Sequence, residues 1–248
     1  MIYLKSDNEI QIMRKSGRIV AELLELLEHH VRPGVTTKEL DSIAEDFIIK
    51  YGARPSFKGY YGFPGTLCTS VNEQVVHGIP SDRVLEEGDI ISIDCGVLYQ
   101  GFHGDAARTF AVGKISEEAK KLIEVTKQSF FEGLKFATVG NRIGDISNAI
   151  QRYAESYGFS VVRDYVGHGI GKQIHEEPSV PNFGKAGRGP KLSKGMVIAI
   201  EPMINLGTYA VTELNDGWTV VTLDNRLSAH YENTVAILEN GPEILTII

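Results

Sequence analysis

Four carboxylates stand where the sequence predicts buried β-strands: Asp94, Asp105, Glu201 and Glu232. Asp94 lies inside the run 90–98, whose length and β-branched residues are typical of a buried strand. For any one of these acids, a polar strand end or a buried ion pair is the ordinary explanation. The strands carry no matching set of four basic residues, however, and an unpaired ionised carboxylate is costly to bury. The four acids together therefore predict a divalent metal centre, and their oxygen atoms favour Mn(II), Fe(II) or a similar ion over a thiolate-type zinc site.

Three histidines accompany glycine or proline in segments that could face such a centre. His168 and His175 belong to one glycine-rich segment, in which the missing side chains allow backbone or substrate to approach closely. A turn needs the glycines but not the histidines. His77 is followed by Gly and Pro where an expected strand gives way to a turn. His103 shares a strand face with Asp105, because side chains two residues apart point the same way, and is a candidate hydrogen-bond partner for that acid.

Two amphipathic helices are predicted before the first of the four acids. Ser6 with Glu9 forms a capping box, and apolar residues then recur at three- and four-residue intervals until a Pro-Gly pair ends the helix. Thr36 with Glu39 forms a second capping box, which begins a helix that extends to a Tyr-Gly pair.

The chain also contains an internal repeat. The apolar pattern of residues 34–52 returns in residues 140–158, an offset of 106 (140 − 34). The strand that ends in Asp94 resembles the strand that ends in Glu201, an offset of 107 (201 − 94). These two carboxylates therefore hold equivalent places in two half-chains.

The repeat predicts the fold class. Two halves of similar size, residues 1–113 and 118–248, each with helices and strands, indicate a single α+β domain with pseudo-two-fold symmetry and helices packed on a central antiparallel sheet system. The stretch 176–190 is rich in Pro and Gly and is predicted to be a surface loop.

Composition limits the classes of function. The chain has 248 residues, a net charge of −7 and a pI near 5.5, which argues against a protein that mainly neutralises nucleic-acid phosphates or anionic lipid. No segment approaches the length of a membrane span, and the N-terminus lacks the pattern of a signal peptide. The two cysteines, Cys68 and Cys95, lack the paired spacing of a zinc or redox motif, so a reducing compartment is expected. We expect a cytoplasmic, monomeric enzyme.

The sequence resembles those of the type I methionine aminopeptidases over essentially the whole chain. That family binds two metal ions through two aspartates eleven residues apart, a Gly-His-Gly histidine, a Glu-Pro glutamate and a late glutamate. The matching residues here, in the same order, are Asp94, Asp105, His168, Glu201 and Glu232. The resemblance implies the pita-bread fold and a cofactor of two divalent ions such as Mn, Fe or Co.

The resemblance also implies the substrate site. His77 and His175 match the two substrate-contacting histidines of the family. The residues that match the lining of the methionine side-chain pocket are Tyr60, Phe63, Cys68, Ile174 and Trp218, and apolar, sulfur-tolerant walls suit a thioether.

Three positions depart from the family pattern. Ile174 replaces a common aromatic residue, Phe183 replaces Tyr, and Asn233 replaces His. None of these changes removes a metal ligand. His230 occupies a place held by Gln or His in relatives, where a role in orienting the site is expected.

The activity implied is removal of the N-terminal methionine from peptides and nascent proteins, with a small second residue preferred. A water that bridges the two ions is expected to lose its proton and attack the first peptide carbonyl, while His175 or His77 supports the oxyanion and Glu201 passes on the proton. Transient association with the ribosome is a further expectation, and no nucleic-acid substrate or membrane partner is expected.

Two other functions compete with this one. An Xaa-Pro aminopeptidase or prolidase shares the fold and a similar ligand set but usually carries a large N-terminal domain, for which the first ten residues here leave no room. A non-catalytic peptide-binding protein of the same fold would be expected to have lost metal ligands, and all five are present.

Overall fold

The computed structural model describes residues 1–248 and contains four α-helices. Their bounds are α1 (Asp7–His30), α2 (Thr37–Lys50), α3 (Glu117–Leu134) and α4 (Ile143–Ser156). Both predicted capping boxes are present, with Ser6 as the N-cap of α1 and Thr36 as the N-cap of α2. The two predicted N-terminal helices are confirmed.

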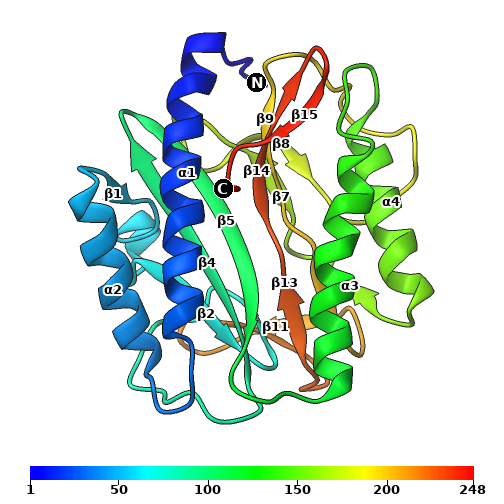
Figure 1. The fold of residues 1–248 in the computed structure, drawn as a ribbon. Coiled ribbons are helices and arrows are strands. Elements are labelled where there is room, and N and C mark those ends of the chain that lie inside the picture. The colour runs from blue at the N-terminus through cyan, green and yellow to red at the C-terminus, as the bar shows by residue number, and fades with distance from the viewer.

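The helices follow the period of the repeat. Helix α4 begins 106 residues after α2 (143 − 37), and both helices are 14 residues long. Figure 1 shows α1 and α2 on the left of the molecule and α3 and α4 on the right, with the strands between and behind them. None of the four helices combines the length and the apolar character that a membrane span requires.

The strands form four antiparallel sheets, which confirms the predicted α+β class. The first-half strands are β1 (Arg54–Pro55), β2 (Leu67–Val71), β3 (Gln74–Val76), β4 (Ile90–Tyr99) and β5 (Phe102–Ala111), with a short 3₁₀ helix, η1 (Tyr60–Gly62), after β1. The second-half strands are β6 (Ser160–Val161), β7 (Gly167–Gly169), β8 (Glu176–Val180), β9 (Val197–Ile200), β10 (Met203–Asn205), β11 (Val211–Glu213), β12 (Val220–Thr222), β13 (Ser228–His230), β14 (Asn233–Leu238) and β15 (Gly241–Ile244). One sheet joins β1, β2, β4 and β5, and a five-stranded sheet has the order β15-β14-β9-β7-β8.

Two antiparallel strand pairs follow one another in the same register, with a short interruption between them. Strand β9 pairs with β14, and, after a break of two residues in each chain segment, β10 pairs with β13. Glu201 lies in the break between β9 and β10, and Glu232 lies in the break between β13 and β14. Both glutamates therefore lie in the same interruption of the ladder, between the Ile200–Asn233 and Met203–His230 pairs.

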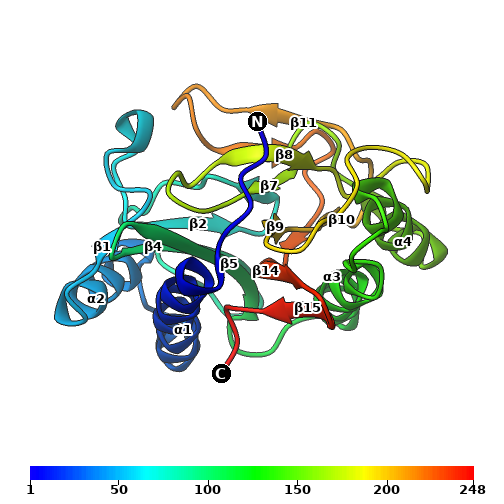
Figure 2. The same cartoon turned by 90° about the horizontal axis from the view of Figure 1, so that it is seen from above.

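Strand β5 of the first half meets β14 of the second half at the centre of the molecule, where Figure 2 shows β4, β5 and β14 as neighbours. The Thr234 hydroxyl accepts a hydrogen bond from the Asp105 N–H at 3.0 Å and donates one to the Asp105 carbonyl at 2.9 Å. The Glu232 N–H donates to the Ala107 carbonyl at 3.0 Å. These bonds fix the backbones of two of the four acids against each other.

Helix α1 lies closely on β4 and β5, and small residues make this approach possible. A Cβ added at Gly104 of β5 would lie 2.8 Å from the backbone nitrogen of Gly17 in α1. The buried apolar residues of α1, α2, β2 and β4 form one core cluster, and those of α3, α4, β9 and β14 contribute to a second. Each half thus packs its helices on the strands that carry or flank its acids.

The prediction of a surface loop over 176–190 is wrong for its first five residues, which form β8. This strand pairs only with β7 and lies at the edge of its sheet, the position in a sheet where a proline such as Pro178 is tolerated. Pro and Gly content alone could not distinguish an edge strand from a loop.

Candidate metal centre

Asp94 and Asp105 lie diagonally across one antiparallel hairpin. The pairing of β4 with β5 sets Asp94 opposite Ala107 and Gly96 opposite Asp105, so the two aspartates share a face of the sheet. Asp105 is 2% exposed, while Asp94 keeps a small exposed part that lines a cavity. Because β4 and β5 each carry one aspartate on the same face of the hairpin, the eleven-residue spacing brings the two carboxylates together.

His168 and the two glutamates complete the cluster. The His168 Nε2 atom lies 3.6 Å from Glu201 Oε1 and 3.9 Å from Asp105 Oδ2. Glu232 is 2% exposed and contributes a donor atom to each of two groups of three side chains whose donor atoms all lie within 4.8 Å of one another. These groups are Asp105, His168, Glu232 and Asp94, His230, Glu232. The structure thus brings together all five residues predicted as metal ligands.

Unpaired polar atoms show that this cluster fits metal ions. The buried atoms Asp94 Oδ1, Asp105 Oδ1 and Glu232 Oε1 have no hydrogen-bond partner. Buried polar atoms are rarely left unpaired, because each one loses the hydrogen bonds that water gives it in the unfolded chain. A divalent cation would satisfy these oxygen atoms and neutralise the charge of the carboxylates at once.

Electrostatics agrees with this interpretation. Burial raises the pKa of Asp94 to about 7. For Asp105, Glu201 and Glu232 burial is again the largest cause, and repulsion from neighbouring carboxylates raises the pKa of each further. The raised pKa values favour the protonated form of each acid in the absence of a cation, and a cation that binds there would displace protons.

The tautomer of His168 suits a metal ligand. Its Nδ1 lies 2.9 Å from the carbonyl oxygen of Gly169, so Nδ1 must carry a proton and donate it. Burial lowers the pKa of this imidazole to about 3, which keeps the ring neutral. The lone pair of Nε2 is therefore directed at the acids, the arrangement in which a histidine binds metal.

A cavity of about 230 Å³ opens onto the carboxylates. Its lining includes the four acids, His168, both predicted substrate-contacting histidines and four of the five predicted pocket residues. The four are Tyr60, Phe63, Cys68 and Trp218.

The walls of this cavity are held by contacts among its own residues. The Tyr60 hydroxyl lies 2.8 Å from His175 Nδ1, and the Phe63 and Trp218 rings pack edge to face with centroids 5.0 Å apart. Burial, reinforced by the charge of Asp94, raises the pKa of the Cys68 thiol well above its usual value. Cys68 therefore serves as a neutral, polarisable wall.

Two sequence-based expectations differ from the structure. Ile174 is not part of the cavity lining but lies 2% exposed in the core cluster that also contains Phe63 and Cys68. The His103 Nδ1 atom lies 2.8 Å from the Ser56 hydroxyl, so His103 pairs with Ser56 and not with Asp105. His103 shares a strand face with Asp105, but its hydrogen-bond partner is a residue far away in sequence.

Sequence reasoning also missed some residues of the cavity. Tyr165 lines it, and its ring packs edge to face on His77 with centroids 5.5 Å apart. Phe57, Val76, Val166 and Met203 line it as well. Tyr165 and Val166 directly precede the Gly-His-Gly motif, which was the one signal that could have pointed to them.

Comparison with known proteins places this arrangement in a family. The model of "Metallopeptidase family M24" matches residues 11–239. The chain belongs to metallopeptidase family M24. The methionine aminopeptidase of Clostridium perfringens is 67% identical to it over 248 residues, which cover 100% of both chains. The predicted family resemblance and enzyme class are confirmed.

Solved structures give the same fold. The methionine aminopeptidase of Rickettsia prowazekii superposes with a TM-score of 0.98 at 43% identity, and the match covers 100% of each chain. The prolidase of Pyrococcus furiosus superposes with a TM-score of 0.79 at 25% identity, over 99% of this chain but only 65% of the prolidase. The predicted pita-bread fold is confirmed, and the prolidase-like alternative is less supported than the methionine aminopeptidase.

We predict that Asp94→Asn stabilises the metal-free protein by an amount that grows with pH. The pKa of Asp94 is raised from 3.8 to about 7 in the folded chain. Below about pH 3.8 Asp94 is protonated in both the folded and the unfolded chain and does not affect stability. Between about pH 3.8 and pH 7 it increasingly destabilises the folded chain, and above about pH 7 the effect is complete. Asn cannot ionise and avoids this cost. In thermal unfolding after chelation, the Tm of the variant should exceed that of the wild type more at about pH 8 than at about pH 5.

Each kcal/mol of added stability at the unfolding midpoint corresponds to a rise in Tm of about 2 to 4 °C in a domain of this size. Saturating Mn(II) should reverse the order, because the variant lacks a charged ligand. A gap that stays constant or narrows as pH rises would contradict the electrostatic account of the centre.

Proposed function

We propose that this chain is a methionine aminopeptidase that removes the N-terminal methionine from peptides and nascent proteins and prefers a small second residue. One observation carries the proposal: a single cavity is bounded by the four acids and also by the apolar and sulfur-containing side chains of Phe63, Cys68 and Trp218. Such walls suit an unbranched thioether, and they lie beside the group of residues that can activate water. The identity to the Clostridium perfringens enzyme over both full lengths supports it.

Five residues would hold two divalent ions in this proposal: Asp94, Asp105, His168, Glu201 and Glu232. Glu232 belongs to both groups of clustered donor atoms, which suits a carboxylate shared by two ions. The ligands are oxygen-rich with imidazole, so Mn(II), Fe(II), Co(II) or a similar ion is favoured. When bound, the pair supplies Lewis acidity to the substrate carbonyl and lowers the pKa of water.

The remaining chemistry falls to side chains of the cavity. When the Tyr60 hydroxyl donates to His175 Nδ1, the ring proton of His175 resides on Nε2 and can be donated to the carbonyl oxygen of the substrate. His77 lines the same cavity and is a second candidate donor. Glu201 lies at the cavity edge of the carboxylate cluster, where it can take the proton of the attacking water and pass it to the leaving amine.

We infer that residues 1–248 act as one catalytic domain, because each half alone supplies only part of the ligand set. Asp94 and Asp105 come from the first half, and His168, Glu201 and Glu232 come from the second. We place the enzyme in the cytoplasm as a monomer, where nascent chains that begin with methionine are its substrates and brief association with the ribosome would bring it to them. The two cysteines, both buried and unpaired, are consistent with a reducing compartment.

Cleavage of a short peptide panel tests the substrate class. With Mn(II), Fe(II) or Co(II) supplied, Met-Ala, Met-Gly and Met-Ser peptides should be cleaved, and Met-Leu should be cleaved far more slowly, because a large second side chain would clash beside the metal ligands. The measurement is kcat/KM for each peptide. Comparable values for Met-Ala and Met-Leu would refute the proposed preference. Release of residues before Pro without a requirement for Met would favour the prolidase-like alternative, and no hydrolysis with two ions bound would favour a peptide-binding protein.

Two histidines seven residues apart should behave differently when replaced. His168→Ala should weaken metal binding, because the Nε2 lone pair directed at the acids is lost. His175→Ala should leave the metal bound but lower kcat by roughly a hundred- to a thousandfold, the effect of losing one donor to an oxyanion, about 2.7 to 4 kcal/mol. Calorimetric metal titration and steady-state kinetics separate the two. If His175→Ala loses metal while His168→Ala keeps it, the two roles must be exchanged.

A further inference from the structure

His230 is a buried histidine beside the metal centre for which the proposed mechanism has no use. It ends β13, two residues before Glu232, and is 2% exposed. Its backbone is fixed on both sides: its N–H donates to the Thr109 hydroxyl at 2.9 Å, and its carbonyl accepts from that hydroxyl at 2.9 Å. The backbone that carries the ring is therefore held in place by the adjacent strand β5.

The Nε2 atom of this ring has no hydrogen-bond partner although it is buried. It lies 3.8 Å from Glu232 Oε2 and 3.8 Å from Glu201 Oε2. Both distances are too long for hydrogen bonds. Two donors that each bind one ion at about 2.0 to 2.2 Å can stand up to about 4 Å apart, so these spacings suit atoms that share a cation.

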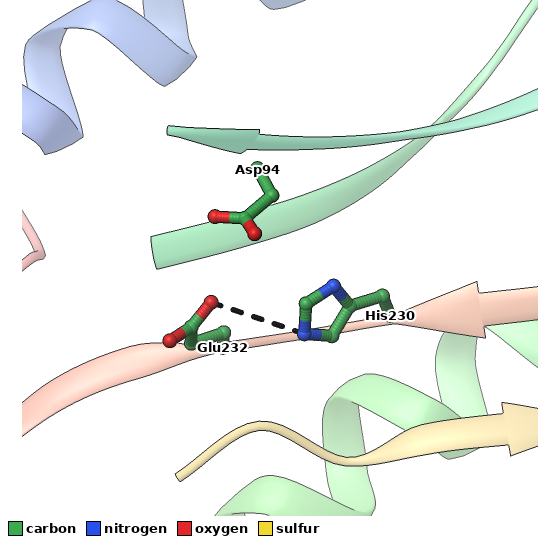
Figure 3. Close-up of side chains that lie close together, drawn as sticks. All are labelled: Asp94, His230 and Glu232. Carbon is green, nitrogen blue, oxygen red and sulfur yellow. Dashed lines mark ion pairs between the residues drawn. The ribbon is translucent and has the colours of Figure 1, made fainter. Parts of the chain in front are cut away.

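Figure 3 shows the arrangement from which the inference follows: Asp94 comes from β4 and directs its carboxylate toward His230 and Glu232 on the facing chain segment. Donor atoms of these three side chains lie within 4.8 Å of one another. The other group of donors, Asp105, His168 and Glu232, has the same composition of one aspartate, one histidine and the shared glutamate.

We propose that His230 is a direct ligand of the ion held by Asp94 and Glu232, so that each of the two ions receives one imidazole. This inference rests on the proposed dinuclear centre and extends its ligand set from five residues to six. An imidazole in place of one more oxygen ligand favours Fe(II), Co(II) or Zn(II) over Mn(II) and Mg(II) at that position. His230 thus sets which metals the ion position beside Asp94 prefers.

The alternative role is a ring that donates a hydrogen bond from Nε2 to one of the glutamates and only orients it. That role would place Nε2 within about 3.2 Å of an acceptor, and both glutamate oxygens lie at 3.8 Å. Replacing either a direct ligand or a residue that only orients a ligand weakens metal binding, since residues of the second kind already contribute about 10- to 100-fold in metal affinity. Affinity alone therefore does not separate the roles, and a count of bound imidazoles does.

Paramagnetic proton NMR of the Co(II)-loaded protein in water provides that count, because each ligating imidazole gives one strongly shifted, exchangeable ring N–H signal. With two equivalents of Co(II), the wild type should show two such signals. His230→Gln should lose one of them, and His168→Gln should lose the other. In calorimetric titrations His230→Gln should also weaken the affected Co(II) site by at least about tenfold, with a smaller loss for Mn(II).

Matched controls make the result decisive. His29→Gln removes an exposed histidine in the last turn of α1 and should keep both signals, and His175→Gln should keep both as well. A single shifted signal in the doubly loaded wild type, or the same two signals in His230→Gln, would overturn the proposal even if His230→Gln proved hard to fold. These spectra report the metal and not turnover, so failure of the peptide panel and failure of this inference are distinguishable.

Discussion

The burial of four neighbouring carboxyl groups, which opposes their ionisation, is the constraint on which the centre of this structure depends. Asp94, Asp105, Glu201 and Glu232 share one cluster, and burial raises the pKa of each. Packing alone does not favour such a cluster, since three of its buried oxygen atoms lack any hydrogen-bond partner. The surrounding strands therefore hold together acids whose unpaired oxygen atoms a bound cation would satisfy, so metal binding would offset the cost of burying them.

The backbone achieves this placement by two devices that belong to different halves of the chain. The first half presents its two aspartates on one face of the β4–β5 hairpin. The second half interrupts a strand pair so that Glu201 and Glu232 lie outside the ladder, opposite each other. Hydrogen bonds between Thr234 and Asp105 hold the two devices together. The four acids and the apolar walls proposed to hold the methionine side chain line one and the same cavity.

Local signals carried much of the fold and of the candidate site. Capping boxes at Ser6 and Thr36 predicted where α1 and α2 begin, because the residues involved lie within one turn. The offset of 106 residues predicted α4, and the carboxylates were recognisable because acids are out of place in apolar strands. Long-range pairing was not visible in the same way. The edge strand β8 and the bond between His103 and Ser56 depend on partners distant in sequence.

The burial of Ile174 in the core cluster with Phe63 and Cys68 also depends on contacts between residues distant in sequence. The sequence predicted only an orienting role for His230, and the ligand role proposed for it could not be predicted from its neighbours in sequence. Its distance from Glu201, 29 residues earlier (230 − 201), depends on how β10 and β13 pair. The types of residue predicted a metal site, and the register of the strands determines which of those residues lie in the cluster.

Anomalous diffraction from crystals of the Co(II)- or Mn(II)-loaded protein tests the central claim most directly. The account predicts two peaks about 3.5 to 4 Å apart, both within bonding distance of Glu232, one of them beside His168 and the other beside Asp94. Data collected on either side of the metal absorption edge would identify the peaks as the added ion. A fully loaded crystal without a peak among the four carboxylates, or with its ions bound only elsewhere on the chain, would contradict the account.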